Sequence, residues 1–123
     1  LKFTQKGIEK LGIKVNSLSQ KVKELSGGNQ QKIVVSKWLD RNMELLIYDE
    51  PTKGIDIAAK EDIFRTVEEF SGKGTGVIFI SSDLEEVLRV ADRVLVIRDG
   101  EVVGQLENTD ITVQDIMNKI FDV

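Results

Sequence analysis

Two short stretches decide the fold: residues 25–32 read LSGGNQQK, and residues 45–51 read LLIYDEP. The first predicts a helix that begins at a serine and two glycines, where unpaired N–H groups favour an anion such as phosphate. The second is an apolar strand that ends in two adjacent carboxylates, Asp49 and Glu50. Open α/β sheets bind ligands at the carboxyl ends of such strands. Together the stretches describe half of a nucleotide-binding site.

Each stretch also has a simpler interpretation. Residues 26–28 could be an ordinary capped helix start, and Asp49 and Glu50 could be a solvated strand end. In that second interpretation Pro51 pushes Glu50 toward extended backbone, because proline disfavours the helical region for the residue before it. The length of the run from 25 to 32 and the pairing of the two stretches favour the nucleotide site.

The other half of such a site, a phosphate-binding loop of the form G-x-x-x-x-G-K-[ST], is missing from the sequence. Gly7 and Gly12 have the spacing, but Ile13 stands where the lysine belongs. Residues 72–74 read GKG and lack the hydroxyl residue that would touch magnesium. Because the sequence also begins at Leu1 rather than at a methionine, we expect a C-terminal piece of a larger domain.

Composition narrows the possible chemistry. The 123 residues are 41% hydrophobic, which suits one compact domain. The sequence has no histidine, which excludes Ser-His-Asp hydrolysis and imidazole metal sites, and no cysteine, which excludes disulfides. The net charge of -4 argues against a nucleic-acid surface. No apolar run is long enough for a transmembrane helix and none resembles a signal peptide, so a membrane connection would run through a partner.

Hydrophobic spacing predicts alternating strands and helices, and therefore an α/β sheet. The expected helices span residues 28–40, 57–70 and 84–90, and the expected strands span 45–48 and 77–80. Continuous apolar runs predict parallel strands covered on both faces. Asp83 is the expected N-cap of the third helix. The expected buried stripes are Val34, Val35, Trp38 and Leu39 on the first helix, and Ala58, Ile63, Val67 and Phe70 on the second.

The last third of the sequence predicts an antiparallel hairpin and a short helix. Apolar runs at 94–97 and 102–106 flank Asp99-Gly100, a strong signal for a two-residue hairpin turn. We expect this hairpin to close the sheet as an antiparallel edge. Thr112 is the candidate cap of a C-terminal helix.

These residues together resemble the ATP-binding cassette (ABC) ATPases, and specifically the second nucleotide-binding domain of the carbohydrate-importer type. The family's signature motif is matched at 25–31, its acidic strand at 45–50 and its following loop at 53–56, which reads KGID. The resemblance covers essentially the whole sequence: 1–27 as the end of the helical subdomain and the signature, and 28–123 as the core. It implies a partial P-loop NTPase-like core, a mostly parallel sheet with helices on both faces and a C-terminal antiparallel hairpin, without the phosphate-loop half.

The resemblance also implies roles for individual residues. Ser26, Gly27 and Gly28 would contact the γ-phosphate of an ATP held by the opposing domain. Asp49 would position Mg²⁺, and Glu50 would be the general base. The remaining cofactor-binding residues are Gln30 and Asp56, the latter at the seam between two domains.

One position departs from the family's pattern. The switch histidine that touches the γ-phosphate corresponds here to Ser82, which can hydrogen-bond but carries no charge near neutral pH. The departure puts hydrolysis at the site of Glu50 in doubt, and it implies an asymmetric pair in which one site turns over faster.

The function implied is that of an ATP-hydrolysing subunit that powers sugar import from the cytoplasmic face of the membrane. Its partners would be a second nucleotide-binding domain, transmembrane permease subunits and, indirectly, an extracytoplasmic sugar-binding protein. Two alternatives stay open: a soluble ABC-type ATPase in repair or translation, and a non-catalytic dimerisation or regulatory module. The acidic composition counts against the first alternative, and the retained Glu50 counts against the second.

The family's sheet places the phosphate-loop strand between the strands expected at 77–80 and 94–97. Without it, both strands have an unpaired edge, and such edges pair with whatever is available. We therefore expect the two strands to pair directly within one chain, or the isolated chain to self-associate by exchange between copies.

Overall fold

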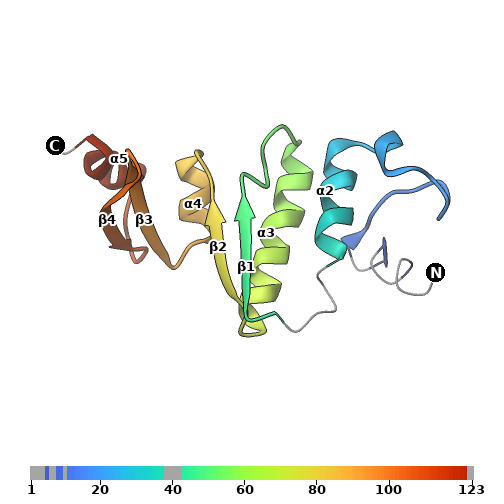
Figure 1. The fold of residues 1–123 in the computed structure, drawn as a ribbon, viewed down its shortest axis with the longest axis horizontal. Helices are drawn as coiled ribbons and strands as arrows, with labels where there is room; N and C mark the ends of the chain where they lie inside the picture. Colours follow the sequence, from blue (N-terminus) through green and yellow to red (C-terminus); the bar gives the residue numbers. More distant parts are fainter. Residues whose placement is uncertain (1–4, 6–7, 10, 38–42, 122–123) are drawn as a thin grey trace. The chain divides into compact units, whose positions relative to one another are not determined.

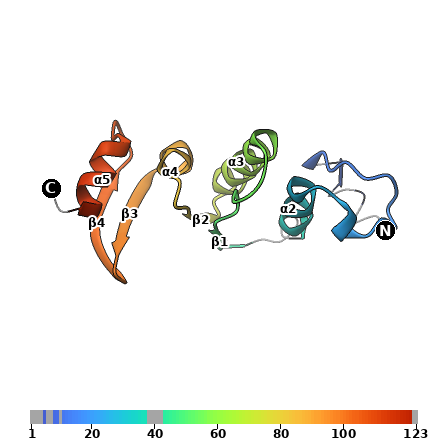
Figure 2. The ribbon, with the colours of Figure 1, turned by 90° about the horizontal axis from the view of Figure 1, so that it is seen from above.

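The computed structural model describes residues 5, 8–9, 11–37 and 43–121. The chain forms two compact units. Unit 1 comprises Leu1–Ile47 and Pro51–Ile78, and unit 2 comprises Tyr48–Glu50 and Phe79–Val123. The elements, drawn in Figures 1 and 2, are η1 (Val22–Glu24), α2 (Gly27–Ser36), β1 (Leu45–Asp49), α3 (Ile57–Gly72), β2 (Gly76–Ile80), α4 (Leu84–Val90), β3 (Arg93–Arg98), β4 (Glu101–Glu107) and α5 (Val113–Phe121).

Strands β1 and β2 form a two-stranded parallel sheet, as the sequence predicts (Figure 1). At one end the Gly76 N–H donates to the Glu44 carbonyl at 2.8 Å, and at the other the Glu50 N–H donates to the Ile80 carbonyl at 2.9 Å. The residue numbers of the bonded partners increase in the same direction along both strands, which indicates parallel pairing. The α/β class with a parallel pair is therefore confirmed.

The expected coverage of these strands on both faces is wrong for the described residues. Burial alternates along each strand: the Tyr48 side chain is buried, whereas those of Leu45, Ile47, Ile78 and Ile80 remain 45–57% exposed. Alternation is the pattern of a sheet with one covered side, since successive side chains point to opposite faces. The described part of the chain leaves the second side open.

The predicted hairpin is confirmed. Strands β3 and β4 pair antiparallel, with Arg98 opposite Glu101 next to the turn. Asp99 and Gly100 have φ values of 52° and 83°, the left-handed conformation that a tight hairpin of matching twist requires at both central residues. Among the described strands, this hairpin is a separate two-stranded sheet, and β2 is not hydrogen-bonded to β3. Direct pairing of those two strands is therefore a wrong expectation: β2 pairs with β1, and β3 pairs with β4. Exchange between copies stays a prediction.

Helix boundaries follow local signals. Helix α4 begins where Asp83 caps it: the Asp83 carboxylate accepts the N–H groups of Glu85 at 3.1 Å and Glu86 at 3.3 Å. At the start of α5, the Thr112 hydroxyl accepts the Asp115 N–H at 3.3 Å, and Asp115 in turn accepts the Thr112 N–H at 2.7 Å. The carboxylate contacts confirm Asp83 as the cap of α4, and the reciprocal contacts confirm Thr112 as the cap of α5.

The predicted buried stripes need correction. Helix α2 begins at Gly27, one residue earlier than expected, and ends at Ser36; Trp38 and Leu39 lie outside the described residues. Val34 is 49% exposed whereas Val35 is buried, because one helical step of about 100° separates the two side chains. On α3 the buried residue is Ala59 rather than Ala58, together with Ile63, Phe64, Thr66, Val67 and Phe70.

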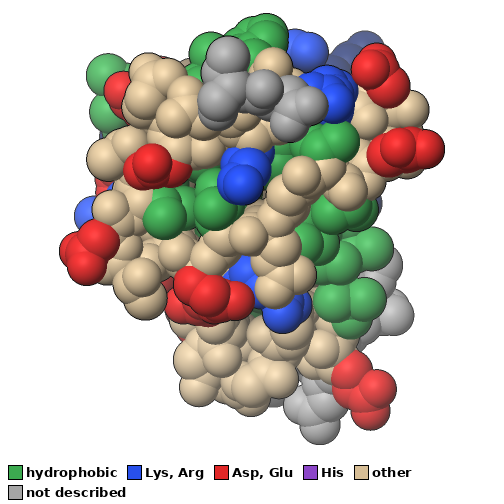
Figure 3. Space-filling model, turned by 90° about the vertical axis from the view of Figure 1, so that its left-hand side faces the viewer, with side chains coloured by type: hydrophobic (Ala, Val, Ile, Leu, Met, Phe, Trp, Pro, Cys, Tyr) green, Lys and Arg blue, Asp and Glu red, His purple; other side chains and the backbone are tan. Residues whose placement is uncertain are grey.

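The core of unit 2 is built between the hairpin and the last helix. Val94 and Val96 of β3 and Ile116 of α5 are buried together, and the hydrophobic side chains of α4 pack against them. The Asn108 side-chain amide ties the hairpin to the end of α4 by donating to the carbonyls of Leu88 at 2.8 Å and Ala91 at 2.7 Å. Figure 3 views this end of the chain and shows hydrophobic side chains at its surface; Val102 and Phe121 are more than 60% exposed. Among the described helices, none is both long and apolar enough to cross a membrane.

Tyr48 provides a test of β1 burial. Burial raises the pKa of Tyr48 from 10.0 to about 12. Below pH 10 the phenol is neutral in both states; above it the unfolded chain loses the proton first, so stability falls between about pH 10 and 12. At about 1.4 kcal/mol for each pH unit, we expect a loss of about 3 kcal/mol across this window.

Tyr48→Phe should remove this loss while leaving the contribution of the lysines, so the difference between the two chains isolates Tyr48. Denaturant titrations at several pH values would measure it, and the phenolate absorbance can be assigned because the sequence has one tyrosine. Identical alkaline profiles for the two chains would contradict the burial of Tyr48.

Candidate functional site

The start of α2 carries the serine and glycines of the signature stretch. Ser26 is the N-cap of the helix, and its hydroxyl oxygen accepts the Asn29 N–H at 3.4 Å. By helix geometry, the N–H groups of Gly27 and Gly28 have no carbonyl within the helix to bond. Ser26 and Gly27 are exposed. The helix therefore presents a hydroxyl and backbone donors, a donor set that fits a phosphate.

The two glycines differ in their surroundings. A Cβ atom added to Gly28 would lie 2.5 Å from the Cβ atom of Ala59 on α3, which is far inside van der Waals contact. A Cβ atom on Gly27 would lie 3.9 Å from Ile55, an ordinary contact. Gly28 is therefore required for the close approach of α2 and α3, and Gly27 is the glycine that remains at the surface.

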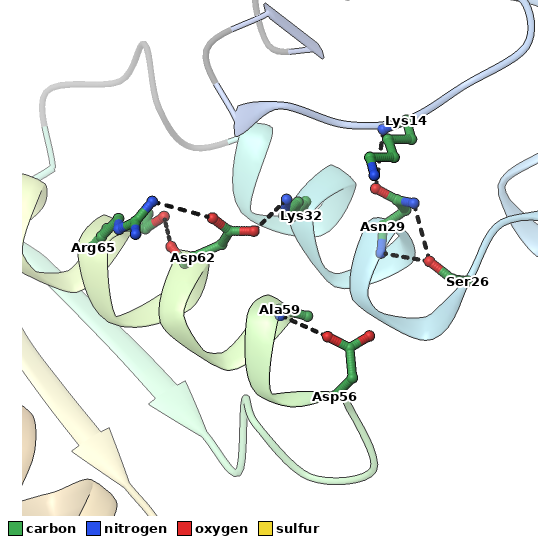
Figure 4. Close-up of polar contacts among 9 residues, drawn as sticks. Lys14, Ser26, Asn29, Lys32, Asp56, Ala59, Asp62 and Arg65 are labelled. Atoms are coloured by element: carbon green, nitrogen blue, oxygen red, sulfur yellow. Dashed lines mark hydrogen bonds and ion pairs between the residues drawn. The ribbon is translucent and has the colours of Figure 1, made fainter.

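Asp56 lies beside this helix start. One of its carboxylate oxygens caps α3 by accepting the Ala59 N–H at 2.9 Å, and the other would be 3.9 Å from a Cβ atom on Gly28. An ion pair between Lys32 and Asp62 joins the same two helices farther along (Figure 4). Unit 1 thus brings together the signature residues and Asp56, which the sequence places 28 positions after Gly28.

Gln30, predicted as a cofactor-binding residue, has part of its side chain engaged within the chain. Its amide nitrogen donates to the Leu25 carbonyl at 2.8 Å. This bond closes the turn that leads into α2, because it pairs a carbonyl just before the helix begins. The amide oxygen of Gln30 is the part of the group left for a ligand.

Glu50 has an unusual backbone conformation. Its φ is 46°, in the left-handed region, which corrects the extended backbone expected before Pro51. Two hydrogen bonds hold it there: its N–H donates to the Ile80 carbonyl, and its carboxylate accepts the Ser82 N–H at 2.9 Å. Left-handed backbone at a bulky residue costs free energy, and such strain is typical of functional positions.

Ser82 therefore meets Glu50 through its backbone, while its side chain is exposed. Neighbouring groups fix the turn between β2 and α4 that contains Ser82. The Ser81 hydroxyl accepts the Asp83 N–H at 3.1 Å and lies 3.1 Å from the buried carboxylate of Glu86. Unit 2 thus brings together Glu50 and Ser82, both predicted from the sequence, and holds the exposed Asp49 at the end of β1.

Several residues around these sites escape analysis of the sequence. Lys32 and Asp62 pair across 30 positions, and Ala59 and Gly28 meet across 31, distances along the chain that no local motif records. Their spacing of three residues within α3 places Ala59 and Asp62 on the same face of the helix. Their partner helix is visible only in the structure.

Comparison with known proteins identifies the family. The model of the ABC transporter family matches residues 3–53, which include the signature stretch and the acidic strand. The chain belongs to the ABC transporter ATPase family. Curated members are similar to this ABC chain over most of its length. The arabinose import ATP-binding protein of Pectobacterium atrosepticum is 45% identical over 90% of the chain, and the ribose import ATP-binding protein of Bacillus cereus is 47% identical over 94%. This ABC chain spans only 22% and 23% of their lengths.

Solved structures agree with the ABC fold. The ADP conformation of an ATP-binding cassette of an ABC transporter superposes with a TM-score of 0.75 at 25% identity, covering 98% of this chain and 48% of the cassette. A dimeric bacterial ABC transporter cassette superposes with the same TM-score at 22% identity, over 89% of this chain and 47% of the cassette. The ABC chain therefore matches about half of each solved cassette.

Proposed function

We propose that this chain is part of the ATP-hydrolysing subunit of a sugar importer. The observation that carries the proposal is its 43–47% identity, over 89–94% of the chain, to proteins named as arabinose, ribose and xylose import ATP-binding proteins. Because the chain spans about a quarter of those proteins, the activity belongs to a longer protein that supplies a phosphate loop.

In this proposal the start of α2 binds the γ-phosphate of an ATP molecule held by an opposing domain. Ser26 donates its hydroxyl hydrogen, and Gly27 adds an exposed backbone N–H. Gly28 acts mainly by letting α2 approach α3, and Asp56 fixes the start of α3 beside it. Gln30 contributes its amide oxygen as a hydrogen-bond acceptor for the bound ATP, because its amide nitrogen is bonded to the Leu25 carbonyl.

Asp49 and Glu50 divide the remaining tasks. The exposed carboxylate of Asp49 is an oxygen donor of the kind that Mg²⁺ prefers, and the ion when bound neutralises charge on phosphate oxygens. Glu50 orients the attacking water and accepts its proton, since the Ser82 N–H and the strained backbone hold its side chain in one place. Ser82 occupies the position of the family's switch histidine and supplies a neutral hydroxyl there.

The proposed partners are a second nucleotide-binding domain, permease subunits in the membrane and, through them, a sugar-binding protein. The proposed location is the cytoplasmic face of the membrane. These follow from the import function named for the relatives, and from the dimeric cassette among the solved structures.

The proposal predicts that this chain alone binds Mg²⁺-ATP weakly and does not hydrolyse it, because its sequence lacks a phosphate loop. The full-length protein should bind Mg²⁺-ATP tightly and hydrolyse it. Isothermal titration with Mg²⁺-ATP and a phosphate-release assay on both proteins would measure this. Micromolar or tighter binding by the chain alone, or no hydrolysis by the full-length protein with its permease and sugar-loaded binding protein, would contradict the proposal.

A further inference from the structure

The side chain of Asn29 links Ser26, the serine of the signature stretch, to the backbone of Lys14, which lies fifteen residues before Asn29 (Figure 4). Its amide oxygen accepts the Lys14 backbone N–H at 3.1 Å, and its amide nitrogen donates to the Ser26 hydroxyl oxygen at 3.0 Å. The Asn29 backbone N–H donates to the same oxygen at 3.4 Å. One residue thus makes two contacts with Ser26 and one with the main chain before it.

The contact with Lys14 determines which way the amide faces. A backbone N–H can only donate, so it requires the oxygen of the Asn29 amide, and the nitrogen is left to face Ser26. The Ser26 oxygen accepts from Asn29 twice, and a hydroxyl has two acceptor lone pairs and one hydrogen. Both acceptor positions are filled, so the hydrogen is the part of the hydroxyl that is free for a ligand.

We propose that Asn29 is a positioning residue that makes the Ser26 hydroxyl a hydrogen-bond donor toward phosphate. It does so because Lys14 fixes the orientation of its amide. The inference rests on the proposed function, in which Ser26 binds the γ-phosphate. It adds that the polarity of Ser26 is set by a contact outside the signature stretch.

Asn29→Asp is the sharpest test, since it keeps the shape of the side chain and the acceptor for Lys14. A carboxylate cannot donate, so the Ser26 hydrogen would turn toward it and away from the phosphate. A hydrogen bond to a charged group is lost, and a negative charge is added near the anion. We expect the kcat of the full-length ATPase to fall about ten- to hundredfold. Gln114→Glu, an exposed change of the same kind on α5, is the matched control and should leave kcat unchanged.

A double-mutant cycle separates positioning from a general structural role. Asn29→Ala should lower kcat in the wild-type background and cost nothing further in Ser26→Ala, because Asn29 acts through the hydroxyl. Equal losses in both backgrounds, or full activity in Asn29→Asp, would overturn the inference.

Measurements on this chain by nuclear magnetic resonance keep the inference testable if the proposed function fails. Ser26→Ala should shift the side-chain amide protons of Asn29. Asn29→Ala should speed hydrogen exchange at the Lys14 amide, whereas Asn29→Asp should preserve its protection. If Ser26→Ala leaves the Asn29 amide resonances in place and Asn29→Ala leaves the exchange rate of the Lys14 amide unchanged, the positioning contact is absent and the inference is wrong. If the full-length protein hydrolyses no ATP while these shifts occur, the proposed function fails and the contact stands.

Discussion

Glu50→Gln in the full-length ATPase is expected to slow ATP hydrolysis at its own site about a hundredfold or more while leaving the affinity of that site for ATP nearly unchanged. The amide oxygen of glutamine can still accept the Ser82 N–H, so the side chain keeps its place. It loses the ability to accept a proton from water, and that ability is the role proposed for Glu50. Single-turnover hydrolysis and nucleotide binding, measured separately, would give the two effects.

The control for this prediction is Glu101→Gln, which makes the same chemical change at an exposed residue of β4. It should leave both kcat and binding unchanged. If Glu50→Gln instead weakens ATP binding as much as it slows turnover, Glu50 contributes to the structure of the site and not to the reaction.

The features predicted correctly from the sequence are those with a local physical cause. Asp83 caps α4 because a carboxylate pairs with the N–H groups of the next turn, and Asp99-Gly100 forms the hairpin turn because both residues tolerate positive φ. Ser82, by contrast, is predicted from the family resemblance and not from a local signal, and it meets Glu50 because the strands that precede them, β1 and β2, are neighbours.

The features that were missed depend on contacts between distant segments. The orientation of the Asn29 amide depends on Lys14, and the need for Gly28 depends on Ala59. The coverage of β1 and β2 differs from the expectation for a related reason. A continuous apolar run shows that both sides of a strand suit a core, but it does not show whether the chain at hand covers both.

The backbone of Glu50 shows how a local rule can be overruled. Proline disfavours the helical region for the residue before it, and the extended region is the usual result. Here Glu50 takes a left-handed φ of 46°, because its N–H bonds to β2 and its carboxylate bonds to the turn after β2. Two tertiary hydrogen bonds offset a conformational cost of about 1–3 kcal/mol.

Gly28→Ala is expected to destabilise this chain by about 1–3 kcal/mol, the range for forcing an extra methyl group into a packed site. The added Cβ atom would lie 2.5 Å from that of Ala59, so α2 and α3 must separate. Separation would also loosen the ion pair between Lys32 and Asp62. Denaturant unfolding, followed by the helical signal in circular dichroism, would measure the loss.

The matched control is Gly27→Ala, where the added Cβ atom meets Ile55 at an ordinary 3.9 Å. We expect no loss of stability from it, since alanine is the better helix former. Ala59→Gly should rescue Gly28→Ala, because the methyl group on residue 28 can then occupy the space that Ala59 vacates. The rescue must overcome the cost of about 1 kcal/mol for a glycine inside α3, so a double variant more stable than Gly28→Ala alone demonstrates the contact. Losses that simply add would show that α2 and α3 do not meet at these residues.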